Sequence, residues 1–153
     1  MAQQIQLKGD FRHEENIGSG VITPGMLLEV ATNTDGDMLV KAHATEGGQF
    51  ERLFAVEDAL QGKTVADNYA DGDLVSYHVA QPGAEVMALV NGGVGLSNVQ
   101  LGEQLISHGD GTLCPIGDLN TTTLDDFVVA IAMETVDLSQ TADVDTLVRV
   151  RVL

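Results

Sequence analysis

Ile22-Thr-Pro-Gly25-Met-Leu-Leu28 and Val99-Gln-Leu-Gly102-Glu-Gln-Leu105 open two similar stretches of this chain. Each stretch continues through an Asp-Gly turn and closes on an apolar residue followed by Ala-x-Glu: Asp35-Gly36 with Phe54-Ala-Val-Glu57, and Asp110-Gly111 with Ile131-Ala-Met-Glu134. The section between the copies belongs to neither. A repeated strand–turn–strand–strand unit predicts an all-β fold, either as one sheet system or as two related units.

Composition supports one small domain whose core is aliphatic. The chain has 153 residues and 17 glycines, only 4% of its residues are aromatic, and it has no tryptophan. Val, Leu, Ile and Ala must therefore fill the core, while glycine serves the turns. Cys114 is the single cysteine, so an intrachain disulfide is ruled out. We interpret Cys114 as a small core residue in a chain that folds in a reducing compartment.

The chain is strongly acidic. It carries 23 Asp and Glu against 7 Lys and Arg, a formal charge of −16. Such a charge repels phosphate backbones, so we expect no direct nucleic-acid partner. The charge either keeps the protein soluble in general or serves a face that stays soluble at high local density. No apolar run reaches the ~18 residues of a membrane span, and we expect no membrane association.

The first 20 residues differ from the rest. Ile5 and Leu7 alternate with polar residues, Phe11 follows, and Gly18-Ser-Gly20 forms a joint. Such a segment is either an ordinary first strand or an arm that adds to the sheet edge of a neighbour. We divide the chain into an N-terminal arm over residues 1–20 and a β-rich domain over residues 21–153.

Turn signals come at short intervals after residue 20, which is typical of an all-β sandwich or barrel. The runs between them predict strands at Met26–Ala31, Met38–His43, Leu74–Val79, Glu85–Val90, Phe127–Met133 and Leu147–Leu153. In the last run the valines should face the core and the arginines the solvent. A short helical turn is expected from Val56 to Gly62, and a second at Thr122 or Thr123.

The motifs that resemble functional sites are incomplete. Asn33-Thr-Asp35-Gly-Asp37 begins like a calcium loop, but Ala44 stands where the final glutamate belongs, so a hairpin turn is the better interpretation. Gly92-Gly-Val-Gly-Leu-Ser97 lacks the lysine of a phosphate-binding loop.

Catalytic and metal-binding patterns are missing too. The spacing of His13, His43, His78 and His108 puts no two of them on one metal. Ser107 and His108 are sequence neighbours, which does not build a nucleophile–base pair. We therefore expect no enzyme activity, no metal and no cofactor.

Several segments, taken in order, carry a resemblance to a known family. They are Leu53-Phe-Ala-Val-Glu-Asp-Ala-Leu-Gln-Gly-Lys-Thr64, Tyr69-Ala-Asp-Gly-Asp-Leu-Val75, Pro82-Gly-Ala-Glu-Val-Met-Ala-Leu-Val90, Gly102, Gly109-Asp-Gly-Thr-Leu113, Ile131-Ala-Met-Glu-Thr-Val-Asp137 and Arg149-Val-Arg-Val152. Over residues 20–153 the chain resembles the head decoration, or cement, proteins of tailed bacteriophages.

The resemblance implies a β-rich structural protein made in the host cytoplasm. It would assemble as a homotrimer on the outer surface of the capsid and stabilise the expanded head by bridging major capsid subunits. Ile5, Leu7 and Phe11 would carry the arm that binds the capsid or a neighbouring subunit. A surface module that binds carbohydrate or a receptor is the alternative. Sugar sites usually use aromatic platforms, and the chain offers only Tyr69, Tyr77 and four Phe, which counts against it.

Overall fold

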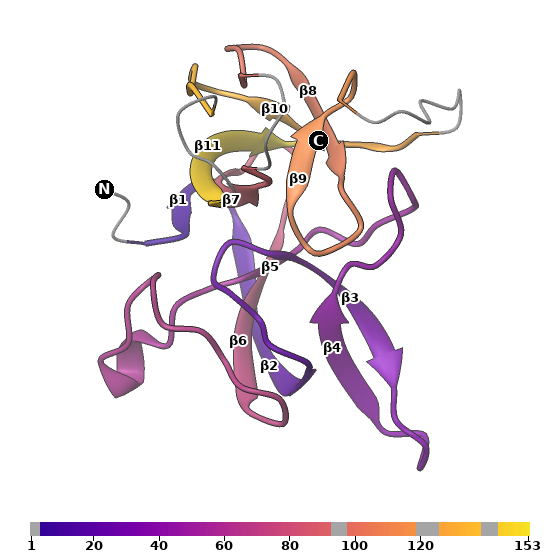
Figure 1. The fold of residues 1–153 in the computed structure, drawn as a ribbon. Helices are drawn as coiled ribbons and strands as arrows, with labels where there is room; N and C mark the ends of the chain where they lie inside the picture. The colour runs from indigo at the N-terminus through magenta and orange to yellow at the C-terminus, as the bar shows by residue number, and fades with distance from the viewer. Residues whose placement is uncertain (1–3, 93–97, 119–125, 139–143) are drawn as a thin grey trace.

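The computed structural model describes residues 4–92, 98–118, 126–138 and 144–153, and these form an almost entirely β structure (Figure 1). The strands are β1 (Gln6–Lys8), β2 (Phe11–Ser19), β3 (Leu27–Thr32), β4 (Met38–Ala42), β5 (Leu53–Ala55), β6 (Leu74–Ala80), β7 (Glu85–Val90), β8 (Gln104–Ser107), β9 (Leu113–Pro115), β10 (Val128–Ala132) and β11 (Thr146–Val152). The predicted all-β class is confirmed, as are the six predicted strands within one or two residues.

Within the described residues, the first half of the chain closes into a barrel with the strand order β2-β4-β3-β5-β6. All neighbours are antiparallel except β2 and β4, which pair in parallel at Gly18↔Val40 and Ser19↔Lys41. We call this the first barrel. It lies below the second half of the chain in Figure 1.

The second half repeats this topology. Its sheet runs β1-β7-β11-β10-β8-β9, and β9 also pairs in parallel with β7 at Val90↔Leu113. Leaving β1 aside, the circuit β7-β9-β8-β10-β11 matches β2-β4-β3-β5-β6 strand for strand. We call this circuit the second barrel. β1 is an addition to it that has no counterpart among the described residues of the first barrel.

The two copies seen in the sequence occupy equivalent places. The Gly25 N–H donates to the Ala55 carbonyl at 2.8 Å, and the Gly102 N–H donates to the Ala132 carbonyl at 2.8 Å. The isolated bridges Ile22↔Tyr69 and Val99↔Val136 also correspond. The repeat is therefore a repeat of backbone geometry and strand pairing.

The interpretation that the middle section belongs to neither copy is wrong. β6 completes the first barrel, while β7 begins the second. The sequence pattern missed this because β2 and β7, and likewise β6 and β11, carry different side chains at equivalent positions.

The core is aliphatic, as the composition predicts. A large cluster fills the second barrel and reaches Leu27 and Phe54 of the first, and a smaller cluster lies inside the first barrel. In β11 the valines are buried and the arginines exposed. Cys114 is fully buried, and burial raises the pKa of its thiol to about 12.

The first predicted helical turn is a 3-10 turn, η1 (Ala59–Gln61), which ends at Gly62. The second, at Thr122 or Thr123, lies outside the described residues, as do residues 93–97 of the glycine-rich loop. Among the residues that the structure describes, no helix is long and apolar enough to cross a membrane.

Candidate binding surface

The three residues predicted for the arm lie in different surroundings. Ile5 is fully buried in the large cluster. Its carbonyl accepts a hydrogen bond from the Met87 N–H at 2.8 Å, and its own N–H donates to the Glu57 carboxylate at 3.1 Å. Leu7 is 38% exposed. The register shift between Gln6 and Lys8 separates these environments, so Ile5 and Leu7 do not share one face.

Phe11 begins β2 and is half-buried, with its ring centroid 5.5 Å from that of His78. β2 pairs with β6 from Phe11↔Ala80 to Ile17↔Leu74. In this structure residues 11–19 therefore follow the first of the two alternatives, an ordinary strand. Binding of the capsid or a neighbour by Ile5, Leu7 and Phe11 stays a prediction.

One edge of β2 is open along most of its length. The Gly18 N–H donates to the Asp73 carbonyl and the Gln81 N–H to the Asp10 carbonyl. By the alternation of an antiparallel ladder, the backbone N–H and C=O of His13 and Glu15 then point away from β6. On that side, β4 pairs with β2 only at Gly18 and Ser19. Among the described residues, no strand covers the edge before Gly18.

The equivalent edge of β7 is covered. Met87 and Leu89 donate their N–H groups to the carbonyls of Ile5 and Gly25 at 2.8 and 2.9 Å. Glu15 and Met87 precede their closing pairs, Gly18↔Val40 and Val90↔Leu113, by the same number of residues. The Ile5 carbonyl of the N-terminal segment thus accepts, in the second barrel, the N–H that is equivalent to the open Glu15 N–H of the first.

A hollow of about 470 Å³ adjoins the open edge. Its lining comes from β2, β3, β4, the start of β5 with the segment before it, and β6 with the turn after it: Arg12, Glu14, Val30, Met38, Phe50, Glu51, Arg52, Leu53, Tyr77, Val79, Ala80, Gln81 and Pro82. Arg12 forms an ion pair with Glu14, whose carboxylate accepts a hydrogen bond from the Tyr77 hydroxyl at 3.0 Å. Burial, with this bond, raises the pKa of Tyr77 to about 12.

The second barrel is packed with aliphatic side chains at the equivalent place. Ala84 and Val86 occupy the positions of Arg12 and Glu14, and Val150 occupies that of Tyr77. All three are at most 2% exposed, and no polar side chain stands among them. The hollow therefore lies at the place where the first barrel has Arg12, Glu14 and Tyr77 and the second barrel has aliphatic residues.

A second groove, of about 400 Å³, lies on the outer face of β2 and β6 beside the N-terminal segment and η1. Its lining holds the carboxylates of Glu15, Glu57 and Asp58 and no Lys or Arg. His13 and His78 lie at its floor with ring centroids 5.4 Å apart. Burial, and then the charge of His13, lowers the pKa of His78 below its ordinary value.

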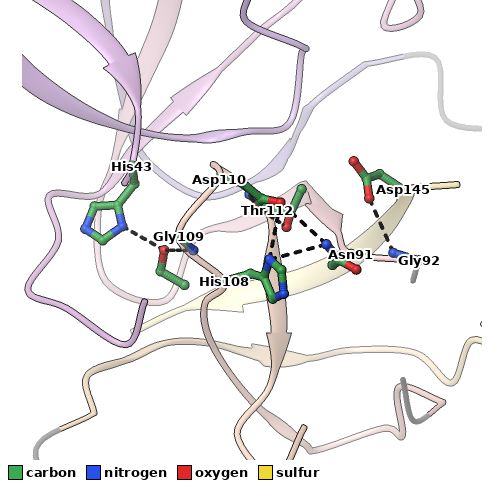
Figure 2. A network of polar contacts seen from close by, with 9 residues as sticks. His43, Asn91, Gly92, His108, Gly109, Asp110, Thr112 and Asp145 are labelled. Carbon is green, nitrogen blue, oxygen red and sulfur yellow. Dashed lines mark hydrogen bonds and ion pairs between the residues drawn. The ribbon is translucent and has the colours of Figure 1, made fainter. Parts of the chain in front are cut away.

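Polar side chains also gather where the barrels meet (Figure 2). His43 follows β4, Ser107 ends β8, and each is 1% exposed. The imidazole Nε2 lies 2.8 Å from the Gln49 carbonyl, which only accepts, so Nε2 carries the hydrogen. In the neutral ring Nδ1 then accepts from the Ser107 hydroxyl, 2.7 Å away, and the same Oγ accepts from the Gly109 N–H.

A neighbouring cluster orders the β8–β9 turn. Asp110 accepts from the backbone N–H and the hydroxyl of Thr112 and lies 3.2 Å from His108 Nδ1. Asn91 lies within 3.5 Å of both His108 and Asp110, and Asp145 accepts from the Gly92 N–H (Figure 2). Burial raises the pKa of Asp145.

Sequence reasoning paired Ser107 with no base, yet the fold places it against His43. The Ser107 hydroxyl is buried between the barrels. In this structure the His43–Ser107 hydrogen bond therefore links the end of β4 to β8, and a substrate has no access to the Ser107 hydroxyl. Within the described ranges, no group of three or more His, Cys, Asp and Glu side chains is arranged to hold a metal ion.

The hollow was not predicted from the sequence. Arg12, Glu14 and Asn16 alternate with His13 and Glu15, so neither face of β2 reads as apolar. The polarity of β2 was the sequence signal that could have revealed the hollow. A strand with no apolar face between Phe11 and Ile17 cannot fill the interior of a barrel with apolar side chains.

Comparisons with known proteins concern the fold. A scan against protein-family models finds no match, and a search of curated proteins finds none. Among solved structures, the chain is similar to the head fiber gp8.5 N base in bacteriophage phi29, with a TM-score of 0.57 and 14% sequence identity. The match covers 94% of this chain and 95% of that one. The likeness extends over both barrels.

Proposed function

We propose that this chain is a structural protein of a tailed-bacteriophage head, bound to the outer surface of the capsid. The observation that carries the proposal is the fold likeness to a phage head fiber base over nearly the whole of both chains. The ordered motifs that resemble head decoration proteins support it independently, because they rest on sequence.

In the finer form of the proposal, three copies assemble as a homotrimer that bridges major capsid subunits and stabilises the expanded head. The formal charge of −16 supports an external position, because an acidic protein is repelled by packaged DNA and stays soluble when crowded on a shell. The fully buried Cys114 fits synthesis in the reducing host cytoplasm.

The surface aromatic residues give little support to a carbohydrate-binding module. Tyr69, Tyr77 and Phe54 are at most 2% exposed. Of the Phe and Tyr residues that the structure describes, only Phe127 is exposed, at 44%, and a single ring is a poor sugar platform.

The test is binding to heads of the phage that encodes the chain, prepared without it. Purified chain should co-sediment with expanded heads, saturate at a multiple of three copies, and appear in maps on the outside of the shell. Decorated heads should withstand a higher temperature than bare heads. Absence of the chain from purified virions, together with no binding to bare heads, would overturn the proposal.

A further inference from the structure

We propose that the open edge of β2 between Phe11 and Glu15, with the hollow beside it, accepts an extended strand from a second protein. The inference rests on the proposed function, because it names the place where the chain contacts its partner on the head. The strand would run antiparallel to β2, as β1 does to β7.

Backbone hydrogen-bonding groups of β2 would recognise the added strand. N–H and C=O groups of His13 and Glu15 point away from β6 and lie at an edge that β4 leaves uncovered. Ile17, further along the same edge, donates its N–H to the side chain of Asn16 at 2.8 Å, which ends the open stretch. An exposed row of such groups is a template for strand addition.

The second barrel shows what kind of segment fits. There the N-terminal segment, Ile5 to Lys8, lies along the equivalent edge of β7 and buries the Ile5 side chain completely. The first barrel offers the same edge beside a hollow whose wall includes Val30 and Met38, which are 39% and 45% exposed. An extended segment with one aliphatic residue would cover both, and methionine adapts readily to such a contact.

The occupant we commit to is a strand of a different protein, neutral or basic in charge. The N-terminal segment of a second copy is already held by its own β7, and freeing it would expose Ile5. Two copies would also each carry a charge of −16. A less acidic segment avoids that repulsion. The hollow itself is balanced in charge, because Arg12 and Arg52 line it together with Glu14 and Glu51, so it also accepts a neutral segment.

Hydrogen exchange on the full-length chain tests the contact. The backbone amides of His13 and Glu15 are followed in the free chain and in the chain bound to expanded heads that lack it. Binding should slow their exchange about tenfold or more if strand addition adds roughly 1.4 kcal/mol of protection. Exchange of Glu14 and Asn16, already bonded to β6, should change little.

Glu15→Pro removes an edge N–H that β6 does not use and places a ring on the open edge. Glu15→Ala is the matched control, because it keeps the N–H and loses only the side chain. With the fold of both variants checked by circular dichroism and thermal unfolding, the proline variant should bind heads about tenfold more weakly and the alanine variant like the natural chain. If the proline variant does not fold, the exchange measurement on the natural chain decides.

The outcomes separate the two proposals. Failure of the natural chain to bind heads would reject the proposed function itself. Binding with unchanged exchange at His13 and Glu15 would overturn the strand-acceptor site and leave the proposed function standing. Protection that appears in the free chain as its concentration rises would identify a second copy as the occupant and overturn the partner named here.

Discussion

The two barrels share strand order, register and several turn hydrogen bonds, yet they differ at one mouth. In the second barrel Ala84 and Val86 face a filled interior, and the N-terminal segment covers the edge of β7. In the first, Arg12 and Glu14 line a hollow, and the edge of β2 is open. The second barrel is thus packed with its own side chains at this place, while the first barrel keeps a backbone edge and a cavity available for contact.

The largest contrast in stability is expected when Glu14 of the first barrel and Val86 of the second, which stand at equivalent positions, are each replaced by the residue of the other. Val86→Glu places a carboxylate inside the buried aliphatic cluster of the second barrel, so we expect a loss of about 3–5 kcal/mol in the free energy of unfolding. Glu14→Val at the solvent-accessible hollow should cost about 1 kcal/mol or less, mainly from the lost Tyr77 hydrogen bond. Denaturant unfolding measures both. Equal losses would mean that the mouths are packed alike.

The two turn glycines offer the next contrast. Gly25 and Gly102 have φ values of 94° and 87°, but a Cβ on Gly25 would lie 2.5 Å from a Leu147 methyl and 3.2 Å from the Leu89 nitrogen, while one on Gly102 meets no atom within 4 Å. Gly25→Ala should therefore cost about 2–4 kcal/mol and Gly102→Ala about 1–2 kcal/mol. Thermal unfolding of the pair checks the order. A larger loss for Gly102→Ala would contradict the contact between the barrels.

Ser107→Ala tests how much the buried hydrogen bond between His43 and Ser107 contributes to stability. The substitution leaves His43 Nδ1 and the Gly109 N–H without the Ser107 oxygen in a buried site, so we expect a loss of about 1–3 kcal/mol. Ser76 in the first barrel is the control, since its hydroxyl bonds to the partly exposed Glu15, and Ser76→Ala should cost about 0.5–1 kcal/mol. Chemical denaturation compares the two. A neutral Ser107→Ala would show that the pair contributes nothing to stability.

The smallest expected effect is a loss of stability in acid that occurs in two steps. It arises from cross-strand pairs that stand at equivalent positions in the two barrels. His13↔His78 in the first barrel corresponds to Glu85↔Arg151 in the second. Because the pKa of folded His78 lies below its ordinary 6.5, the unfolded chain takes up that proton first, and stability falls as the pH drops below about 6.5. The hydrogen bond from Arg149 lowers the pKa of Glu85 below 4.5, so its contribution is lost only below about pH 4.5.

Variants assign the two steps. Unfolding measured from pH 8 to pH 3 should lose its first step in His78→Gln and its second in Glu85→Gln. A profile that keeps both steps in both variants would show that other groups control the pH dependence.

Much of the fold follows from local sequence. Asp-Gly and Pro-Gly pairs place the turns, and the alternation of Val148 to Val152 sets which face of β11 is buried. The pairing of Gly18 with Val40, which closes the first barrel, joins distant segments whose side chains carry no matching pattern. Closure into two barrels therefore could not be predicted from the repeat.

The candidate surface was harder to predict than the fold. The alternation of a strand predicts that Ile5 and Leu7 share a face, but with the register shift in β1 the first is buried and the second is exposed. The open edge depends on the point at which the pairing of β4 with β2 ends, and the hollow is lined by residues from several separate segments of the chain. Neither property is local to the residues concerned.

The most direct test of this comparison is amide exchange at two equivalent residues of the free chain. The Met87 N–H donates to the Ile5 carbonyl at 2.8 Å, whereas the Glu15 N–H lies at the open edge. We predict that Glu15 exchanges about tenfold faster than Met87 or more, a difference of roughly 1.4 kcal/mol in local protection. Equal protection of the two amides would contradict an open edge in the first barrel.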